Sequence, residues 1–386
     1  MNSANSAERP TARVLIVQRR LTHYRVPLFD KLRSLLRMRG IELQLLYGDP
    51  TVEERRKNDE GELDWAVHLP TRYLFGGRVC WQNFREQAKG ASLVIVTQEN
   101  KLLFNHLALT VLRPARLAFW GHGRNFQTTN PDSAAERFKR WTTRQADWWF
   151  AYTDLSRERV VEAGFPSQRV TVLNNAVDTQ GMIALRAAMT DDEVAGMRDR
   201  ISPAGGPIVI FVGSFYAEKR IDFLIEACRC ARQKLDGLQL VMVGSGPDEA
   251  RLRRNSAGES WIHWAGMRRG REKVLLMATA DLMLNPGLVG LGILDSFALG
   301  VPMITTGCGL HSPEIAYLKD GENGLIVADT VAGYAQAIIA TLRDPEMLGR
   351  LRSGCRTSAA LYTMDGMATR FADGVEAALS APARAA

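Results

Sequence analysis

Residues 285–306 of this chain read Asn285-Pro-Gly-Leu-Val-Gly-Leu-Gly-Ile-Leu-Asp-Ser-Phe-Ala-Leu-Gly-Val-Pro-Met-Ile-Thr-Thr306. The run over 281–284 just before them predicts a short buried strand, which Pro286 ends. Three glycines then follow within six residues and allow another group to approach the backbone closely; they are Gly287, Gly290 and Gly292. A short helix is expected next, because Gly300 is typical of a helix C-cap and Pro302 prevents continuation. The stretch therefore predicts strand, glycine loop, helix and strand in succession.

The glycine loop opens a helix, and this arrangement favours a phosphate group as ligand. Free N–H groups and the positive end of the helix dipole meet at such a point. Asp295 lies in the first turn or so, where its carboxylate can also accept hydrogen bonds from a sugar. Spacing alone leaves open the alternative of a tight loop in an α/β sheet that binds no ligand.

The same stretch resembles the signature of the retaining glycosyltransferases of family 4, which have the GT-B fold. That signature reads Pro-Ser-x-x-Glu-Gly-Phe-Gly-Leu-x-x-x-Glu-Ala-x-Ala-x-Gly-x-Pro. Aligned backwards from Gly300-Val-Pro302, its second Glu corresponds to Asp295, which would bind the donor ribose, and its first Glu to Gly287. One carboxylate is thus absent, and backbone groups of the loop are expected to contact the donor instead; the residues concerned are Gly287, Leu288, Val289, Gly290 and Leu291.

A second segment that resembles the family runs from Gly213 to Asp222 and reads Gly-Ser-Phe-Tyr-Ala-Glu-Lys-Arg-Ile-Asp. Lys219 matches a lysine that holds the donor diphosphate, and a lysine is a compact point charge suited to a phosphate. Ser214 stands where the family has Arg, and Arg220 stands where it has Gly. We expect both near the diphosphate; the alternative is an exposed charged turn.

Two further turns of the second half resemble the family. Gly244 opens the sequence Gly-Ser-Gly-Pro-Asp, which matches a Gly-x-Gly-Pro turn. The strand and loop over 262–268, which include Met267, match the segment that cradles the nucleobase largely through backbone groups.

The first half begins with a strand over 13–18, a helix from Pro27 and a strand over 41–47, which together form a βαβ unit. The loop after the first strand is basic and contains Arg19, Arg20 and Arg25. In the family this loop borders the donor pyrophosphate and the acceptor. The alternative is a solvated basic turn.

His122 follows a predicted strand over 117–120 and lies between two glycines. It resembles a family histidine that lies near the donor sugar, and the glycines leave room for a bound ring. The alternative is a loop histidine whose hydrogen bonds are satisfied within the protein. The resemblance thus gives His122, Lys219 and Asp295 the catalytic roles.

The predicted fold class is α/β with the GT-B architecture: two Rossmann-like, doubly wound domains that face each other across a cleft. Residues 1–12 are expected to form a loose tail. The first, acceptor-side domain is expected over 13–200, the nucleotide-sugar domain over 207–361, and a terminal helix over 362–380 that crosses back to the first domain.

Composition limits the classes of function. The 386 residues carry a net charge of +7, which suits phosphate-bearing substrates or an anionic membrane surface and is too weak to indicate nucleic acid. Five scattered cysteines form no zinc motif and indicate a reducing, cytoplasmic environment. No run of eighteen apolar residues and no signal peptide are found, so we expect a cytoplasmic protein.

The resemblance implies transfer of a sugar from a UDP- or GDP-sugar donor to a glycan or lipid-linked acceptor, in envelope or exopolysaccharide assembly. No metal ion and no cofactor are expected, and the donor is a substrate. Peripheral binding to the inner face of the cytoplasmic membrane is expected, with a soluble enzyme as the alternative. Two other classes stay open: a GT-B sugar-nucleotide 2-epimerase, and a glycan- or nucleotide-binding protein without activity.

Overall fold

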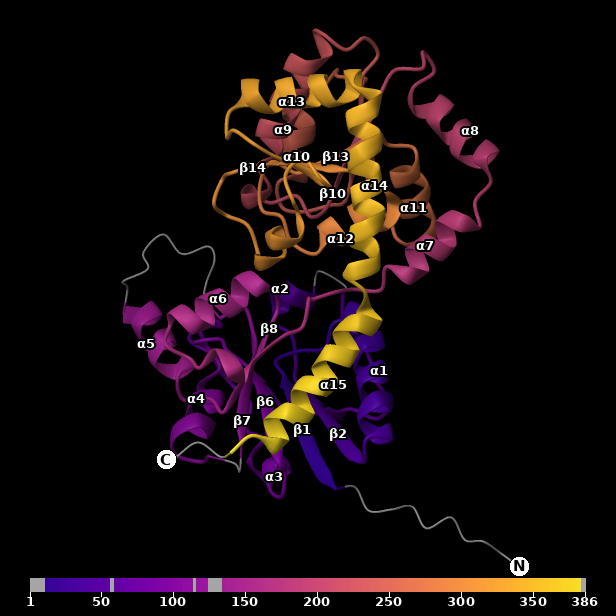
Figure 1. Ribbon diagram of the computed structural model, residues 1–386. Coiled ribbons are helices and arrows are strands. Elements are labelled where there is room, and N and C mark those ends of the chain that lie inside the picture. The colour runs from indigo at the N-terminus through magenta and orange to yellow at the C-terminus, as the bar shows by residue number, and fades with distance from the viewer. Residues whose placement is uncertain (1–10, 56–58, 114–115, 124–133, 383–386) are drawn as a thin grey trace, which may run out of the picture. The chain divides into compact units, whose positions relative to one another are not determined.

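The computed structural model describes residues 11–55, 59–113, 116–123 and 134–382 (Figure 1). These residues form two α/β units. The first contains the chain up to Val177 together with the segment from Met364 onward, and the second contains Asp178–Thr363. The chain therefore passes from one unit to the other twice, once in each direction.

A seven-stranded parallel sheet forms the centre of the first unit, in the order β3-β2-β1-β6-β7-β8-β9. Its strands are β1 Ala12–Gln18, β2 Ile41–Tyr47, β3 Val67–His68, β6 Leu93–Thr97, β7 Leu117–Gly121, β8 Trp148–Ala151 and β9 Val170–Val172. The strands β6, β7 and β8 are almost completely buried, as expected for a parallel sheet covered on both faces. A separate antiparallel hairpin pairs β4 (Arg72–Leu74) with β5 (Val79–Trp81).

Helix α15 (Met364–Ser380) packs in the first unit against α1 (Val26–Met38), although the two are far apart in sequence (Figure 1). Its buried Phe371 lies with its ring centroid 5.0 Å from that of Trp120 and 4.6 Å from that of Phe150. The other helices of this unit are α2 Val52–Arg55, α3 Arg85–Ala88, α4 Leu103–Thr110, α5 Ala134–Thr143 and α6 Asp154–Glu162, with short 3-10 turns η1 His23–Arg25 and η2 Ser167–Arg169.

The second unit is built on a six-stranded parallel sheet in the order β12-β11-β10-β13-β14-β15. Its strands are β10 Ile208–Val212, β11 Gln239–Val243, β12 Ile262–Gly266, β13 Leu282–Leu284, β14 Met303–Thr306 and β15 Gly324–Val327. Its helices are α7 Gln180–Ala187, α8 Asp191–Ile201, α9 Ile221–Arg232, α10 Glu249–Asn255, α11 Gly270–Ala278, α12 Gly292–Leu299, α13 Val331–Arg343 and α14 Pro345–Leu361, with the 3-10 turns η3 Ala217–Lys219 and η4 Pro313–Tyr317. The two parallel α/β sheets expected from the sequence are therefore both present.

The junction between the units lies earlier in the chain than residue 200, where we expected the first domain to end. Helix α7 packs against α11 and α12, which belong to the second unit. Arg198 of α8 forms an ion pair of 2.9 Å with Asp281, and Glu193 forms one of 2.7 Å with Arg271. These contacts place α7 and α8 in the second unit, and the first unit ends near Val177.

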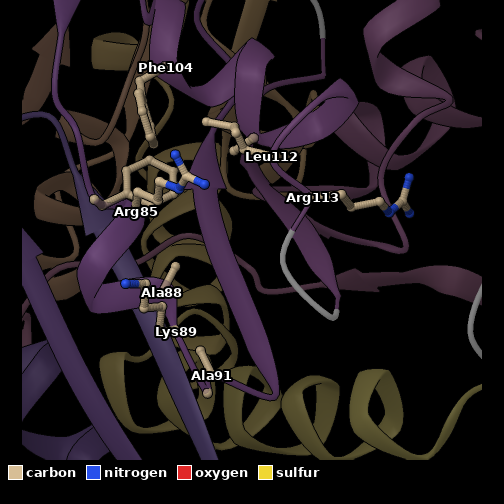
Figure 2. A pocket seen from close by; sticks show the side chains of 10 residues that line it. Arg85, Ala88, Lys89, Ala91, Phe104, Leu112 and Arg113 are labelled. Atoms are coloured by element: carbon tan, nitrogen blue, oxygen red, sulfur yellow. The ribbon is translucent and has the colours of Figure 1, made fainter.

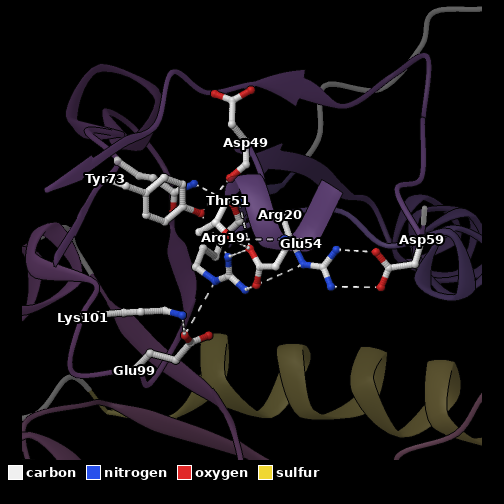
Figure 3. A network of polar contacts seen from close by, with 10 residues as sticks. Arg19, Arg20, Asp49, Thr51, Glu54, Asp59, Tyr73, Glu99 and Lys101 are labelled. Carbon is white, nitrogen blue, oxygen red and sulfur yellow. Dashed lines mark hydrogen bonds and ion pairs between the residues drawn. The ribbon is translucent and has the colours of Figure 1, made fainter. Parts of the chain in front are cut away.

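The basic loop after β1 is held by carboxylates of the same unit (Figure 3). Both Nη atoms of Arg19 donate to Glu54, at 2.7 and 2.6 Å, and both Nη atoms of Arg20 donate to Asp59, at 2.7 and 3.0 Å. Arg19 also donates to the Tyr73 hydroxyl at 3.0 Å. The alternative of a solvated basic turn is therefore wrong for Arg19 and Arg20. Neither guanidinium can contact a ligand without breaking its pair with Glu54 or Asp59.

Arg25, the third basic residue of this loop, is buried. Its Nη2 donates to Asn175 Oδ1 at 2.6 Å, and its guanidinium lies 5.5 Å from the Trp120 ring and 5.8 Å from the Tyr152 ring. Aromatic faces and one amide oxygen therefore compensate the buried charge without a carboxylate. In the part of the chain that the structure describes, no helix is long and apolar enough to span a bilayer.

Replacing Glu54 by Gln is expected to destabilise the first unit and to change how its stability depends on pH. Burial would raise the pKa of Glu54, but hydrogen bonds from Arg19 and Thr51 outweigh burial and lower the pKa from 4.5 to about 2. Stabilisation by this carboxylate is therefore complete above pH 4.5 and is lost as the pH falls toward 2. At pH 7, Glu54→Gln should cost about 1–3 kcal/mol, because it removes the carboxylate that both Nη atoms of Arg19 bind.

Thermal unfolding midpoints of the wild type and the variant, measured between neutral pH and pH 3, test this prediction. Glu53→Gln is the matched control, because Glu53 is exposed on the same helix. Equal midpoints for Glu54→Gln and Glu53→Gln would contradict the assigned role.

Candidate functional site

Three loops of the second unit meet at the carboxyl ends of neighbouring strands, where open α/β sheets bind their ligands. They follow β10, β13 and β14, and β13 lies between the other two in the sheet. The loop after β10 contains Lys219, the loop after β13 is the glycine loop over 285–292, and the loop after β14 leads to His311. The sheet order thus brings together segments that are far apart in sequence.

Gly287 lies directly against the backbone of η3. A Cβ atom added at position 287 would lie 2.1 Å from the Glu218 carbonyl oxygen, so a glutamate at this position would collide with η3. The next residue, Leu288, donates its N–H to the same oxygen at 2.8 Å. The close packing against η3 therefore explains why position 287 is a glycine.

Lys219 is a buried cation whose charge is not balanced by a carboxylate. Its side chain is 9% exposed, and its Nζ donates to the Leu288 carbonyl oxygen. No ion pair involves Lys219 within the described residues. Burial lowers the pKa of Lys219 from 10.5 to about 8. An ammonium in such a place is costly unless an anion binds beside it, which makes Lys219 the strongest candidate for a phosphate contact.

The amino end of α12 supplies further donors. The N–H groups of Gly290, Leu291 and Gly292 make no hydrogen bond in the described part of the protein, whereas those of Leu288 and Val289 are already engaged. Of the five predicted loop contacts, only Leu288 and Val289 thus have their N–H groups engaged among the described residues. Free N–H groups at a helix start add a positive potential close to the ammonium of Lys219.

Asp295 lies in the first turn of α12 and is 9% exposed. Its Oδ2 accepts a 2.6 Å hydrogen bond from Lys273 Nζ on α11. Its other oxygen, Oδ1, has no hydrogen-bond partner in the ranges that the structure describes, and can accept from a ligand hydroxyl. Sequence reasoning did not identify Lys273, because the approach of α11 to α12 is a tertiary contact.

The guanidinium of Arg220 is engaged by other side chains of the second unit. Its guanidinium pairs with Asp329, donates to Thr306 Oγ1 at 3.3 Å and lies 4.5 Å from the Phe223 ring. The residue has φ +55°, a left-handed conformation in which glycine is most easily accommodated, and this explains the glycine of the family pattern. Arg220 can thus reach a phosphate only by giving up Asp329.

The remaining predicted positions of the second unit lie around the same strand ends. Ser214 is exposed after β10, and Met267 is 50% exposed after β12. Gly244, with φ +141°, packs so closely that an added Cβ atom would overlap the Gly213 carbonyl oxygen. Asn285 was not predicted: it is buried, donates to the Leu288 carbonyl oxygen at 3.2 Å, and leaves its own Oδ1 without a partner among the described residues.

His122 belongs to the first unit and lies just after β7, with its ring centroid 4.6 Å from that of Tyr152. His122 is exposed at the surface of the first unit, although protein atoms lie around its ring. This partial desolvation, followed by the positive charges of Lys139 and Arg25, lowers the pKa of His122 below the usual imidazole value. His122 is therefore neutral at pH 7.

A pocket of about 370 Å³ lies elsewhere in the first unit, between α3 and α4 (Figure 2). Phe84 and Phe104 form its apolar wall, and Arg85 and Lys89 lie at its side. It adjoins Ala91, which precedes β6, and so lies at the amino end of that strand. It contains none of the predicted site residues.

Sequence and structure comparisons agree on the fold. Residues 206–344 match the family described as "Glycosyl transferases group 1". The lipopolysaccharide core biosynthesis glycosyltransferase LpsE of Rhizobium meliloti is 28% identical over 200 residues, which are 50% of this chain and 53% of that protein. The alpha-D-kanosaminyltransferase of Streptomyces kanamyceticus is 25% identical over 62% of this chain and 63% of that protein. This chain thus spans only about half to two thirds of the length of these relatives.

Among solved structures, Anabaena Alr3699/HepE in complex with UDP-glucose superposes with a TM-score of 0.69 over 95% of this chain and 99% of that one, at 15% identity. Identity at this level shows the fold alone. The predicted class, two Rossmann-like α/β domains of the GT-B type, is confirmed.

The affinity of the second unit for a nucleoside diphosphate is expected to fall as the pH rises through about 8, because Lys219 with a pKa near 8 becomes neutral and no longer attracts the phosphates. Calorimetric titration with UDP and GDP between pH 7 and pH 9.5 measures this. Lys219→Met should bind both weakly and without that decline. Lys234→Met, at an exposed lysine, is the control, and an unchanged alkaline decline in Lys219→Met would contradict the assignment.

Proposed function

We propose that this chain is a retaining glycosyltransferase that transfers a sugar from a UDP- or GDP-sugar to a glycan or lipid-linked acceptor, in envelope or exopolysaccharide assembly. The observation that carries the proposal is the buried, carboxylate-free ammonium of Lys219 beside the free N–H groups at the start of α12. The match of residues 206–344 to group 1 glycosyl transferases supports it.

In this proposal the diphosphate leaving group is stabilised by fixed positive groups. Negative charge grows on the phosphates as the glycosidic bond breaks, and Lys219 with the N–H groups of Gly290, Leu291 and Gly292 stabilises that charge. The acceptor hydroxyl attacks from the face of the leaving group, and the donor phosphate takes its proton. This route needs no carboxylate nucleophile and no metal ion. His122, neutral at pH 7, is assigned to the donor sugar.

Asp295 is assigned to the ribose hydroxyls through its free Oδ1, while Lys273 fixes the carboxylate through Oδ2. A hydrogen bond to a charged acceptor contributes about 1.5–3 kcal/mol. Asp295→Ala should therefore weaken nucleotide binding by roughly one to two decades, measured by calorimetry with UDP and GDP. Asp199→Ala, at an exposed carboxylate of α8, is the control. Wild-type affinity in folded Asp295→Ala would contradict the assignment.

The proposed reaction is tested by incubating the protein with labelled UDP- and GDP-sugars and candidate acceptors. Free nucleoside diphosphate together with a glycosylated acceptor supports the proposal. An epimerised sugar nucleotide would instead indicate the 2-epimerase alternative. Binding of the nucleotide sugar without any product would indicate a binding protein.

Peripheral association with the inner face of the cytoplasmic membrane remains part of the proposal, on a changed basis. Arg19, Arg20 and Arg25 are engaged within the protein and no longer support it, and the basic cluster over 55–57 lies partly outside the described residues. Helix α5 supports it, because Phe138 and Trp141 are 42% and 48% exposed among exposed arginines. Aromatic and basic side chains together suit an anionic headgroup layer.

Co-sedimentation with anionic liposomes at low salt is expected, and should weaken with rising salt and vanish with neutral lipids. The double change Phe138→Ser and Trp141→Ser should weaken it several-fold. Met38→Ser removes a still more exposed apolar side chain, 75% exposed, from α1 and should have no effect. Absence of binding to anionic liposomes at low salt would leave a soluble enzyme.

A further inference from the structure

His311 joins the loop after β14 to the glycine loop of the second unit. Its Nδ1 accepts a hydrogen bond from the N–H of Val289 at 3.1 Å, and its Nε2 lies 2.7 Å from the Thr306 carbonyl oxygen. The adjacent Ser312 donates its own N–H to the Val289 carbonyl oxygen at 2.9 Å. Both backbone polar groups of Val289 are therefore held by two consecutive residues.

These contacts determine the tautomer of the ring. A nitrogen that accepts from a backbone N–H cannot itself carry a proton, so the proton of the neutral ring lies on Nε2 and is donated to Thr306. Both ring nitrogens are then engaged with backbone groups. No nitrogen is left for a ligand or for proton transfer, so His311 can act on bound molecules only through the loop it holds.

We propose that His311 is a positioning residue that fixes the glycine loop in the form competent to bind a nucleoside diphosphate. The inference rests on the proposed function, because it deepens the role of the same site. Val289 immediately precedes Gly290, the first of the three residues with free N–H groups, and follows Leu288, whose carbonyl oxygen accepts from Lys219. Holding both polar groups of Val289 therefore fixes the position of the free N–H groups that follow it and of the Leu288 carbonyl oxygen, which binds Lys219, before it.

Protonation of the ring would place a second N–H on Nδ1, opposite that of Val289, and two donors would face each other. The neutral ring is therefore the one that supports binding. Other ionisable groups lie around it: Cys308 with Sγ 3.7 Å from Nε2, Arg220 through Thr306, and Lys219 through Leu288. Asp329 pairs with Arg220, and the buried Glu314 follows in η4. These groups are the same in all the variants below, so differences among the variants report the effect of the residue at position 311.

Two substitutions separate the hydrogen bonds of the ring. In His311→Asn, the amide oxygen occupies nearly the place of Nδ1, can accept from Val289 and cannot be protonated. In His311→Gln, the amide reaches the place of Nε2 and Thr306 but leaves the Val289 N–H without an acceptor. We expect His311→Gln and His311→Ala to weaken UDP and GDP binding on the order of tenfold, and His311→Asn to stay within about threefold of the wild type.

Rescue by the conservative variant is a readout that a packing role alone would not give. The amides of Asn and Gln are alike in polarity, and the two variants differ in whether the Val289 N–H keeps its acceptor. Equal losses of affinity in His311→Asn and His311→Gln would overturn the inference.

Amide hydrogen exchange of the loop over 287–293, measured without ligand, keeps the inference distinct from the proposed function. Exchange should be faster in His311→Gln than in wild type and unchanged in His311→Asn. If the wild type bound neither UDP nor GDP, the proposed function would fail, and this exchange pattern would still decide whether His311 holds the loop. Identical exchange in all three proteins would overturn it.

Discussion

The second unit depends on a direct backbone contact between the turn η3 and the glycine loop. The absence of a side chain at Gly287 allows the contact, and two hydrogen bonds cross it in opposite directions: Leu288 donates to Glu218, and Lys219 donates back to Leu288. The same contact removes the Lys219 ammonium from water. The packing of these two loops therefore also creates the desolvated positive charge of the proposed phosphate site.

Two buried cations show how surroundings decide between structure and function. Arg25 is 7% exposed, and an amide oxygen and aromatic faces stabilise its positive charge within the protein. Lys219 is 9% exposed and has one carbonyl oxygen and a single aromatic ring, that of Tyr216 at 5.8 Å. A carbonyl dipole stabilises an ammonium less than a full negative charge does. Evolution keeps such a poorly compensated charge most readily where a ligand supplies the missing anion.

Both sheets could be predicted because most of their strands are short apolar runs, and Gly300 ends α12 in the left-handed conformation that its position required. Lys219 and Asp295 could be proposed as site residues by resemblance. Their partners could not, because Leu288 and Lys273 approach only through the tertiary packing of η3 and α11. The arginines after β1 read as a basic loop since Glu54 and Asp59 are remote in sequence. Likewise, the polar sequence of α8 gave no sign that Arg198 pairs with Asp281 of the second unit.

The first unit is assembled from two pieces of chain that are separated by the whole of the second. Helix α15 covers Trp120 and Phe150 with Phe371, and Gly374 lets its backbone approach Phe150 closely. During synthesis, residues 178–363 leave the ribosome as one continuous segment and can fold before the chain is finished. The first unit cannot, since its sheet waits for α15 with these aromatic rings uncovered. In a growing chain, the half that begins first is therefore completed last, and needs protection from aggregation for longer.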